Sequence, residues 1–231
     1  MNIIEEEVPS NKNARISGAL YLAMAPFAGF SLFVNFSNFI HGDPLQTVTN
    51  IQSVETLYRL GVISWLIQQT IFILLAVSLF NLFRRVNKIS ASLMAVFAFI
   101  GVAVAFSNEI FQFSVLRLVS EGDYLQVFDR VQLNSLVVLF SHLHNHGIQI
   151  AHIFWGLWLF PMAHLIYSSG YFPKIIAVLI AVAGIGYILD FVVNTFLPDS
   201  GITVTQFTFV GEVVFPLWLL FKGVTTKPQK T

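Results

Sequence analysis

PKIIAVLIAVAGIGYILDFVVNTFL, residues 173–197, contains one lysine near its beginning and one carboxylate, Asp190, in an otherwise almost entirely apolar run. A helix needs about 20 apolar residues to cross the hydrocarbon core of a bilayer. Turn-forming sequences flank the run, SSGYFP at 168–173 and LPDSG at 197–201. The stretch therefore predicts a membrane-spanning helix over 173–197.

Five other stretches have a similar length and apolar character, and their expected spans are 15–40, 57–83, 89–117, 145–168 and 205–222. Hydrophobic residues make up 56% of the 231 residues and charged residues 10%, against about 25% charged in soluble domains. The apolar run 133–140 is too short to span, so it predicts an interfacial helix or an extension of the fourth span. The expected fold is all-α, a polytopic membrane helix bundle of six transmembrane helices with this short interfacial helix.

Lysine and arginine placement predicts the orientation of a single transmembrane domain, 14–224, between cytoplasmic tails 1–13 and 225–231. With the N-terminus inside, Arg59, Arg117 and Arg130 fall outside, and the inner side holds the other cations: Lys12, Arg15, Arg84, Arg85, Lys88, Lys174, Lys222, Lys227 and Lys230. Both termini are thus expected in the cytoplasm, in a bacterial cytoplasmic (inner) membrane. The acidic N-terminus MNIIEEEVPSNK is unlike a signal peptide, so the first span is expected to be retained.

Composition also excludes several classes of function. The chain has no cysteine, which excludes disulfides, thiolate metal sites and thiol nucleophiles. Its formal net charge of zero gives no indication of nucleic acid as a partner. The partners to expect are membrane lipid and a small polar ligand or cation, and the sequence does not indicate an oligomeric state.

On this topology the polar residues of every span fall in the outer half of the membrane. Helical spacing places Ala183, Gly186, Asp190 and Asn194 on one face of the fifth span, with small residues below polar ones. A carboxylate costs several kcal/mol in hydrocarbon unless it has a partner, a proton or water. We therefore expect an outward-open polar cavity, lined by Arg59, Glu109, Gln112, Gln149, His152, Asp190, Asn194 and Glu212.

Three functions fit such a cavity. In the first, Asp190, Glu212 and Glu109 bind or transport a cation or a small polar or amphiphilic ligand, Arg59 balances their charge and His152 titrates. In the second, an intramembrane metal-dependent lipid hydrolase holds zinc or another divalent metal through residues drawn from His142, His152, Glu109, Asp190 and Glu212. In the third, the acids join helices of a structural or accessory subunit that has no ligand.

The stretch SHLHNHGIQIAH, residues 141–152, holds four of the six histidines. Gly147 is expected to interrupt the helix, so that His144 and His146 point into the interface or water. His152 lies deeper, on a polar stripe with His142, Asn145 and Gln149.

Short blocks distributed along the chain resemble a family. They are RISGALYL (15–22), RLG (59–61), SGYFPK (169–174), GIGYILD (184–190), and GE (211–212) followed by LWLLFKGV (217–224). Together they resemble a bacterial domain-of-unknown-function family of polytopic membrane proteins, from about residue 14 to 224. The resemblance implies a multi-span helical fold, marks Arg59, Asp190 and Glu212 as motif members, and carries no established activity.

Overall fold

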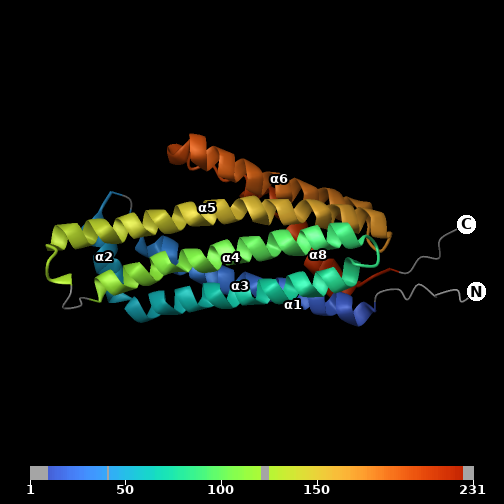
Figure 1. Ribbon diagram of the computed structural model, residues 1–231, viewed down its shortest axis with the longest axis horizontal. Helices are drawn as coiled ribbons and strands as arrows, with labels where there is room; N and C mark the ends of the chain where they lie inside the picture. The colour runs from blue at the N-terminus through green and yellow to red at the C-terminus, as the bar shows by residue number, and fades with distance from the viewer. Residues whose placement is uncertain (1–9, 41, 121–124, 226–231) are drawn as a thin grey trace, which may run out of the picture.

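The computed structural model describes residues 10–40, 42–120 and 125–225, which form helices and no strand. Five helices in these ranges are long and apolar enough to cross a membrane, and they run side by side (Figure 1). They are α1 (Asn11–Asn38), α3 (Glu55–Phe83), α4 (Lys88–Val119), α5 (Arg130–Ser169) and α6 (Lys174–Phe196). The protein is an integral membrane helix bundle, and the expected fold class is confirmed.

The last expected span, 205–222, differs from the other five. It consists of α7 (Thr205–Thr208) and α8 (Val210–Phe221), joined through Phe209. The 12 residues of α8 extend over only about 18 Å, which is less than the hydrocarbon thickness of about 30 Å. This segment still brings the chain back to its starting end, because the Val224 amide donates to Asn11 Oδ1 at 2.8 Å.

The expected interfacial helix before the fourth span is not a separate element. Residues 133–140 belong to α5, a continuous helix of 40 residues. A reciprocal capping box between Asp129 and Gln132 starts this helix earlier than hydropathy alone indicates, and Gly170 in the left-handed conformation (φ 67°) ends it. The prediction that Gly147 interrupts the helix was wrong. A separate short helix, α2 (Pro44–Ser53), instead follows α1.

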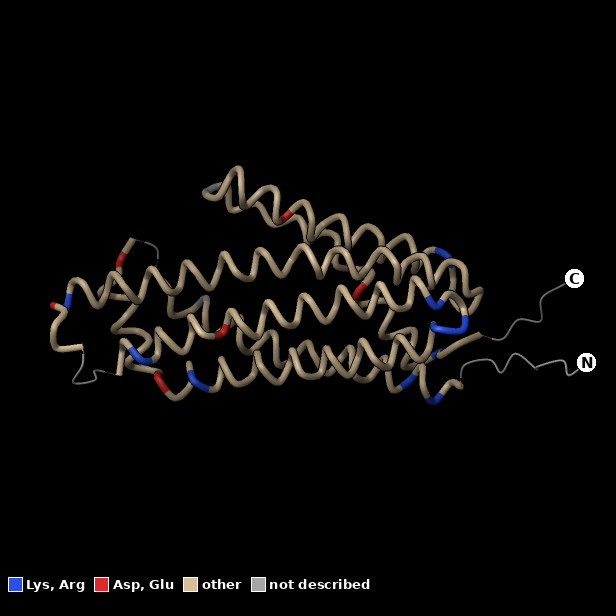
Figure 2. The backbone as a smooth tube through the Cα atoms, in the orientation of Figure 1, with Lys and Arg blue, Asp and Glu red and all other residues tan. Residues whose placement is uncertain are grey.

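Both ends of the described chain lie at the same end of the bundle (Figure 1). Lysine and arginine positions gather at that end, and acidic positions are sparse along the middle of the helices (Figure 2). Lys227 and Lys230, with most of the two expected tails, lie outside the described residues. The arrangement has the charge asymmetry on which the sequence-based orientation depends.

Two apolar clusters form the core and leave a polar band between them. The larger cluster contains Phe72, Val102 and Trp158 and continues towards the termini. The smaller one contains Val62, Val115 and Val137 and lies towards the opposite end. Buried polar side chains of α3, α4 and α5 occupy the intervening turns: Ser64, Gln68, Gln69, Asn108, Glu109, Gln112, Ser141 and His144.

Small residues allow the backbones of α5 and α6 to approach closely. A Cβ added to Gly156 would lie 2.9 Å from the carbonyl oxygen of Gly184, and one on Gly184 would lie 3.0 Å from that of Gly156. Such contacts are typical of helix pairs in membranes. Beyond this point α6 leans away from α5 towards its C-terminal end (Figure 1), where Asp190 and Asn194 are located.

Candidate functional site

Glu109 lies in a buried network between α4 and α5. Its Oε1 is 3.0 Å from His144 Nε2, and the two residues are only 2% and 7% exposed. Gln112 Nε2 lies 3.1 Å from His144 Nδ1, and the Tyr58 hydroxyl donates to Gln112 Oε1. With the amide in this orientation, Nδ1 accepts and Nε2–H donates to the carboxylate. The network therefore gives both ring nitrogens of His144 and Oε1 of Glu109 a hydrogen-bond partner.

The same network corrects the expectation that His144 points into the interface or water. Asn108 Nδ2 donates to the His144 carbonyl at 2.8 Å. The Asn108 side chain also lies against Gly147, so closely that a Cβ on Gly147 would overlap Asn108 Oδ1. Gly147 thus provides space for a buried amide within a continuous helix. His146, by contrast, is exposed on the surface of the bundle.

Asp190 has a different environment, because it binds the start of α7. Its Oδ1 accepts the Val204 N–H at 2.5 Å, and its Oδ2 accepts the Thr205 N–H at 3.1 Å and the Thr205 hydroxyl. Asp190 is fully buried. The carboxylate therefore satisfies backbone donors at a helix N-terminus, where the macrodipole favours a negative charge.

Glu212 lies near the middle of the bundle, among aromatic side chains. Its Oε2 accepts the Tyr21 hydroxyl at 2.9 Å, and the Tyr187 hydroxyl is also hydrogen-bonded to the carboxylate. The Tyr187 ring packs on His152 with centroids 5.4 Å apart, and His152 packs on Trp155 at 5.2 Å. Contacts from α1, α5, α6 and α8 thus converge on one level of the bundle.

Helix α3 completes this level. Trp65 packs on Trp155 with centroids 6.1 Å apart, and Phe72 packs on Trp158 at 4.9 Å. Gln68 and Gln69 lie between these two contacts along α3 and are 7% and 0% exposed. We call the whole set the Glu212 layer: Tyr21, Trp65, Gln68, Gln69, His152, Trp155, Tyr187 and Glu212.

The Glu212 layer holds most of the unpaired buried polar atoms in the described part of the chain. Nine such atoms lack a hydrogen-bond partner there, and seven belong to this layer: Trp65 Nε1, Gln68 Oε1, Gln69 Nε2, Gln69 Oε1, His152 Nδ1, Trp155 Nε1 and Glu212 Oε1. Buried polar groups in native structures are paired with protein, ordered water or a ligand. The layer is therefore where the fold leaves hydrogen-bonding capacity for an occupant.

The remaining predicted residues fall outside the layer. Asn194 Nδ2 lies 3.4 Å from Gln149 Oε1 and donates to the Asp190 carbonyl at 2.8 Å. His142 is exposed, and its ring packs edge-on against Phe39. Arg59 does not balance the buried acids: it is half-exposed and pairs with Glu55, with Nε–Oε1 at 2.9 Å.

The three acids consequently do not line one cavity together. Each is directed to its own partners by the rotation of its helix: Glu109 to His144, Asp190 to the start of α7, and Glu212 to two tyrosines. In the described ranges no group of three His, Asp or Glu side chains is placed to hold a metal ion. The ligand set proposed from His142, His152, Glu109, Asp190 and Glu212 is not brought together.

Sequence reasoning missed the partners of the acids. His144, Tyr58, Tyr21, Tyr187 and Trp65 were not among the predicted site residues, although each contacts a buried acid, its network or the layer. A signal for His144 was present. His144 belongs to a series of residues spaced seven positions apart in the sequence, and the other members are apolar: Val137, Ala151, Trp158 and Leu165. All five residues are buried on α5.

Comparison with known proteins gives similarity along the whole bundle. A family model described as "Domain of unknown function (DUF4386)" matches residues 16–223. A protein of Archaeoglobus fulgidus described as "Uncharacterized protein" is 31% identical over 150 residues, which cover 64% of this chain and 74% of that protein. No solved structure matches the chain significantly.

Proposed function

The chain belongs to the DUF4386 family, as its sequence blocks indicated, and we propose that it binds or transports a cation or small polar ligand in the cytoplasmic membrane. The binding site in this proposal is the Glu212 layer. Glu212 provides the negative charge, and Tyr21 and Tyr187 hold its carboxylate in place.

The observation that carries the proposal is the concentration of unpaired polar atoms in this layer. Leaving a buried polar group without a partner costs about 1–3 kcal/mol each, so seven such atoms favour an occupant strongly. The other two acids provide the contrast. Both oxygens of Asp190 accept protein donors, Oε1 of Glu109 pairs with His144, and neither acid contributes an atom to the unpaired set, which suits a role in holding the bundle together.

The composition of the layer favours a cation over an anion. Glu212 Oε1 is a carboxylate oxygen that faces the layer without a protein donor among the described residues. Aromatic rings attract cations through their electron-rich faces, and the layer contains a chain of three such rings in contact, Trp65 with Trp155 and Trp155 with Tyr187. The indole N–H groups and the Gln69 amide add hydrogen bonds for a polar substituent on the ligand.

A fluorescence titration tests the proposal, because Trp65 and Trp155 are two of the four tryptophans and lie in the layer. Detergent-purified protein is titrated with sodium chloride and with tetramethylammonium chloride. We expect a saturable change for at least one cation, absent in Glu212→Gln. The matched control is Glu109→Gln, which neutralises a buried acid that pairs with His144 outside the layer, and its titration should equal that of the original chain.

Equal titrations in Glu212→Gln and the original chain would refute the proposal. The layer would then hold only internal water, and the protein would be a structural or accessory subunit. Circular dichroism of each variant establishes that helix content is retained before the titrations are compared.

A further inference from the structure

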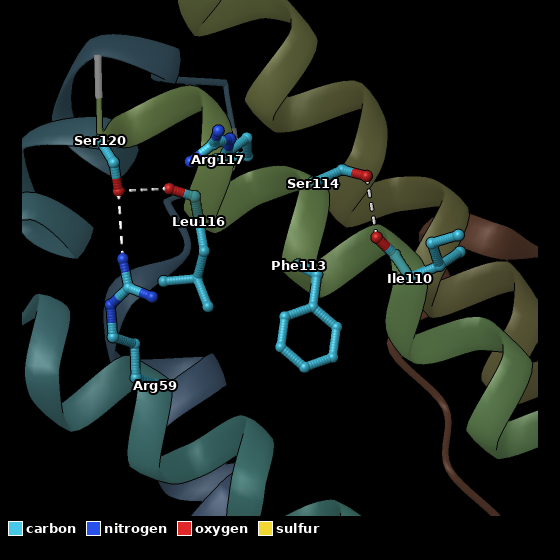
Figure 3. A pocket seen from close by; sticks show the side chains of 7 residues that line it. All are labelled: Arg59, Ile110, Phe113, Ser114, Leu116, Arg117 and Ser120. Atoms are coloured by element: carbon cyan, nitrogen blue, oxygen red, sulfur yellow. Dashed lines mark hydrogen bonds between the residues drawn. The ribbon is translucent and has the colours of Figure 1, made fainter. Parts of the chain in front are cut away.

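A second feature lies away from the Glu212 layer, at the end of the bundle opposite the termini. A pocket of about 430 Å³ opens between α3 and α4 (Figure 3). Its lining combines two arginines and two serines with three apolar side chains: Arg59, Arg117, Ser114, Ser120, Ile110, Phe113 and Leu116.

Helix length places the pocket at the level of lipid headgroups. Lys88 is the first residue of α4 and lies at the end of the bundle that holds the chain termini. At about 1.5 Å per residue, it is separated from Arg117 by about 44 Å along the helix. A bilayer with its headgroup regions is about 40–45 Å thick. If Lys88 lies among the headgroups of one leaflet, Arg117 lies among those of the other, and Arg59 belongs to the same pocket.

The apolar part of the lining lies deeper in the same leaflet. Phe113 and Ile110 precede Arg117 on α4 by about one and two helical turns, or about 6 and 10 Å towards the bilayer centre. Both side chains are largely exposed on the bundle surface, at 50% and 64%. The pocket is thus cationic at headgroup depth and apolar at the depth where acyl chains begin.

We propose that this pocket binds the phosphate group of a membrane phospholipid in the leaflet opposite the termini, with Arg59 and Arg117 on the phosphate and Phe113 and Ile110 against the acyl chains. Guanidinium groups bind phosphate through paired N–H donors. The proposal is independent of cation binding in the Glu212 layer.

The partners of Arg59 leave capacity for such a ligand. Its Nε and Nη2 donate to Glu55 Oε1, and Nη2 also lies 3.2 Å from Ser120 Oγ (Figure 3). A guanidinium has five N–H donors, so a phosphate oxygen can bind beside Glu55.

Native mass spectrometry of the full-length, detergent-purified chain tests the proposal with short-chain phosphatidylglycerol as the probe. We expect Arg117→Gln and Arg59→Gln each to weaken binding about tenfold, the ratio for losing one hydrogen bond to a charged group. Arg130→Gln is the matched control, because Arg130 is an exposed arginine at the same end of the bundle that does not line the pocket. Glu55→Gln should strengthen binding, because it removes the carboxylate that competes for Arg59, and a misfolded variant would not do so.

Two further probes identify the source of the phosphate. Diacylglycerol with the same acyl chains should not bind at this site, and inorganic phosphate should not displace the lipid at equal concentration. Equal binding by the original chain and both pocket variants would overturn the proposal. So would displacement by inorganic phosphate, because the apolar wall would then contribute nothing.

Discussion

The three acids Glu109, Asp190 and Glu212 are stabilised inside the bundle by three different kinds of hydrogen-bond partner. Glu109 is paired with an imidazole, Asp190 with backbone N–H groups, and Glu212 with tyrosine hydroxyls that leave one oxygen unpaired. All three are carboxylates inside the bundle, and they differ in the groups that meet them. An acid whose hydrogen bonds are made to protein groups stabilises the bundle, whereas an acid with an unpaired oxygen can bind a ligand.

Removing the Glu109 side chain should therefore destabilise the fold. We expect Glu109→Ala to lower the free energy of unfolding by about 3 kcal/mol, because it leaves His144 Nε2 buried without its partner. Glu109→Gln should cost less, since the amide oxygen still accepts from His144 Nε2. Glu55→Ala, in the exposed pair with Arg59, should change stability by no more than about 0.5 kcal/mol. Denaturation in detergent measures all three, and equal effects of the two alanine variants would contradict the expectation.

The contact at Gly147 predicts a steric effect. Gly147→Ala should destabilise the protein by about 1–3 kcal/mol, because its Cβ would overlap Asn108 Oδ1. Combining it with Asn108→Ala should recover part of the loss, since the shorter side chain makes room. Gly29→Ala is the control: no atom lies within 4 Å of its added Cβ. A thermal-unfolding shift of equal size for both glycine variants would rule out the steric explanation.

At the scale of elements, Asp190 joins α6 to the returning segment α7–α8. Both carboxylate oxygens accept donors from Val204 and Thr205, which places the beginning of α7 at the depth of Asp190, below the end of α6 at Phe196. The segment between them, with the 3-10 turn η2 (Pro198–Ser200), forms a protruding connection. This accounts for a final helix that is shorter than a full span.

Loss of that carboxylate should loosen α7 specifically. In Asp190→Ala, we expect faster hydrogen–deuterium exchange at residues 204–209, with protection of α3 and α4 unchanged. Thr205→Val keeps the backbone N–H and removes only the hydroxyl donor, so its increase in exchange should be smaller. Unchanged exchange at 204–209 in Asp190→Ala would mean that packing of Thr208 against Gly186, rather than the carboxylate, holds this element.

At the scale of the whole molecule, the bundle contains a polar band between two apolar clusters. Its lysine and arginine positions gather at the end where the termini lie (Figure 2). By the positive-inside rule, we expect that end to face the cytoplasm. The proposed phospholipid pocket then belongs to the outer leaflet, and the Glu212 layer lies within the membrane.

Single-cysteine labelling tests this orientation directly, because the chain has no cysteine of its own. In intact cells, a membrane-impermeant maleimide should label Ser53→Cys, at an exposed position of α2, and should not label Thr225→Cys, whose backbone N–H donates to the Tyr171 carbonyl between α5 and α6. Both positions should react after permeabilisation. The reverse pattern in intact cells would invert the topology and move the proposed lipid pocket to the cytoplasmic leaflet.

Much of this fold could be predicted from the sequence. Residues 173–197 were expected to span, and α6 occupies Lys174–Phe196; the second and third expected spans likewise correspond to α3 and α4. The errors lie in local signals that hydropathy does not contain. The capping box at Asp129 extends α5, and the hydrogen bonds to Asp190 shorten the last span.

The sequence by itself determined the solvent, the long apolar helices and the charge asymmetry, because each depends on composition and order along one chain. Only the tertiary structure decided which residues meet: Glu109 with His144, Asp190 with Thr205, Glu212 with Tyr21. The physical reason is rotation. One residue turns a helix by about 100°, so a small shift in its rotation directs the same side chain to a different neighbour, and the hydropathy of a single helix does not specify that neighbour.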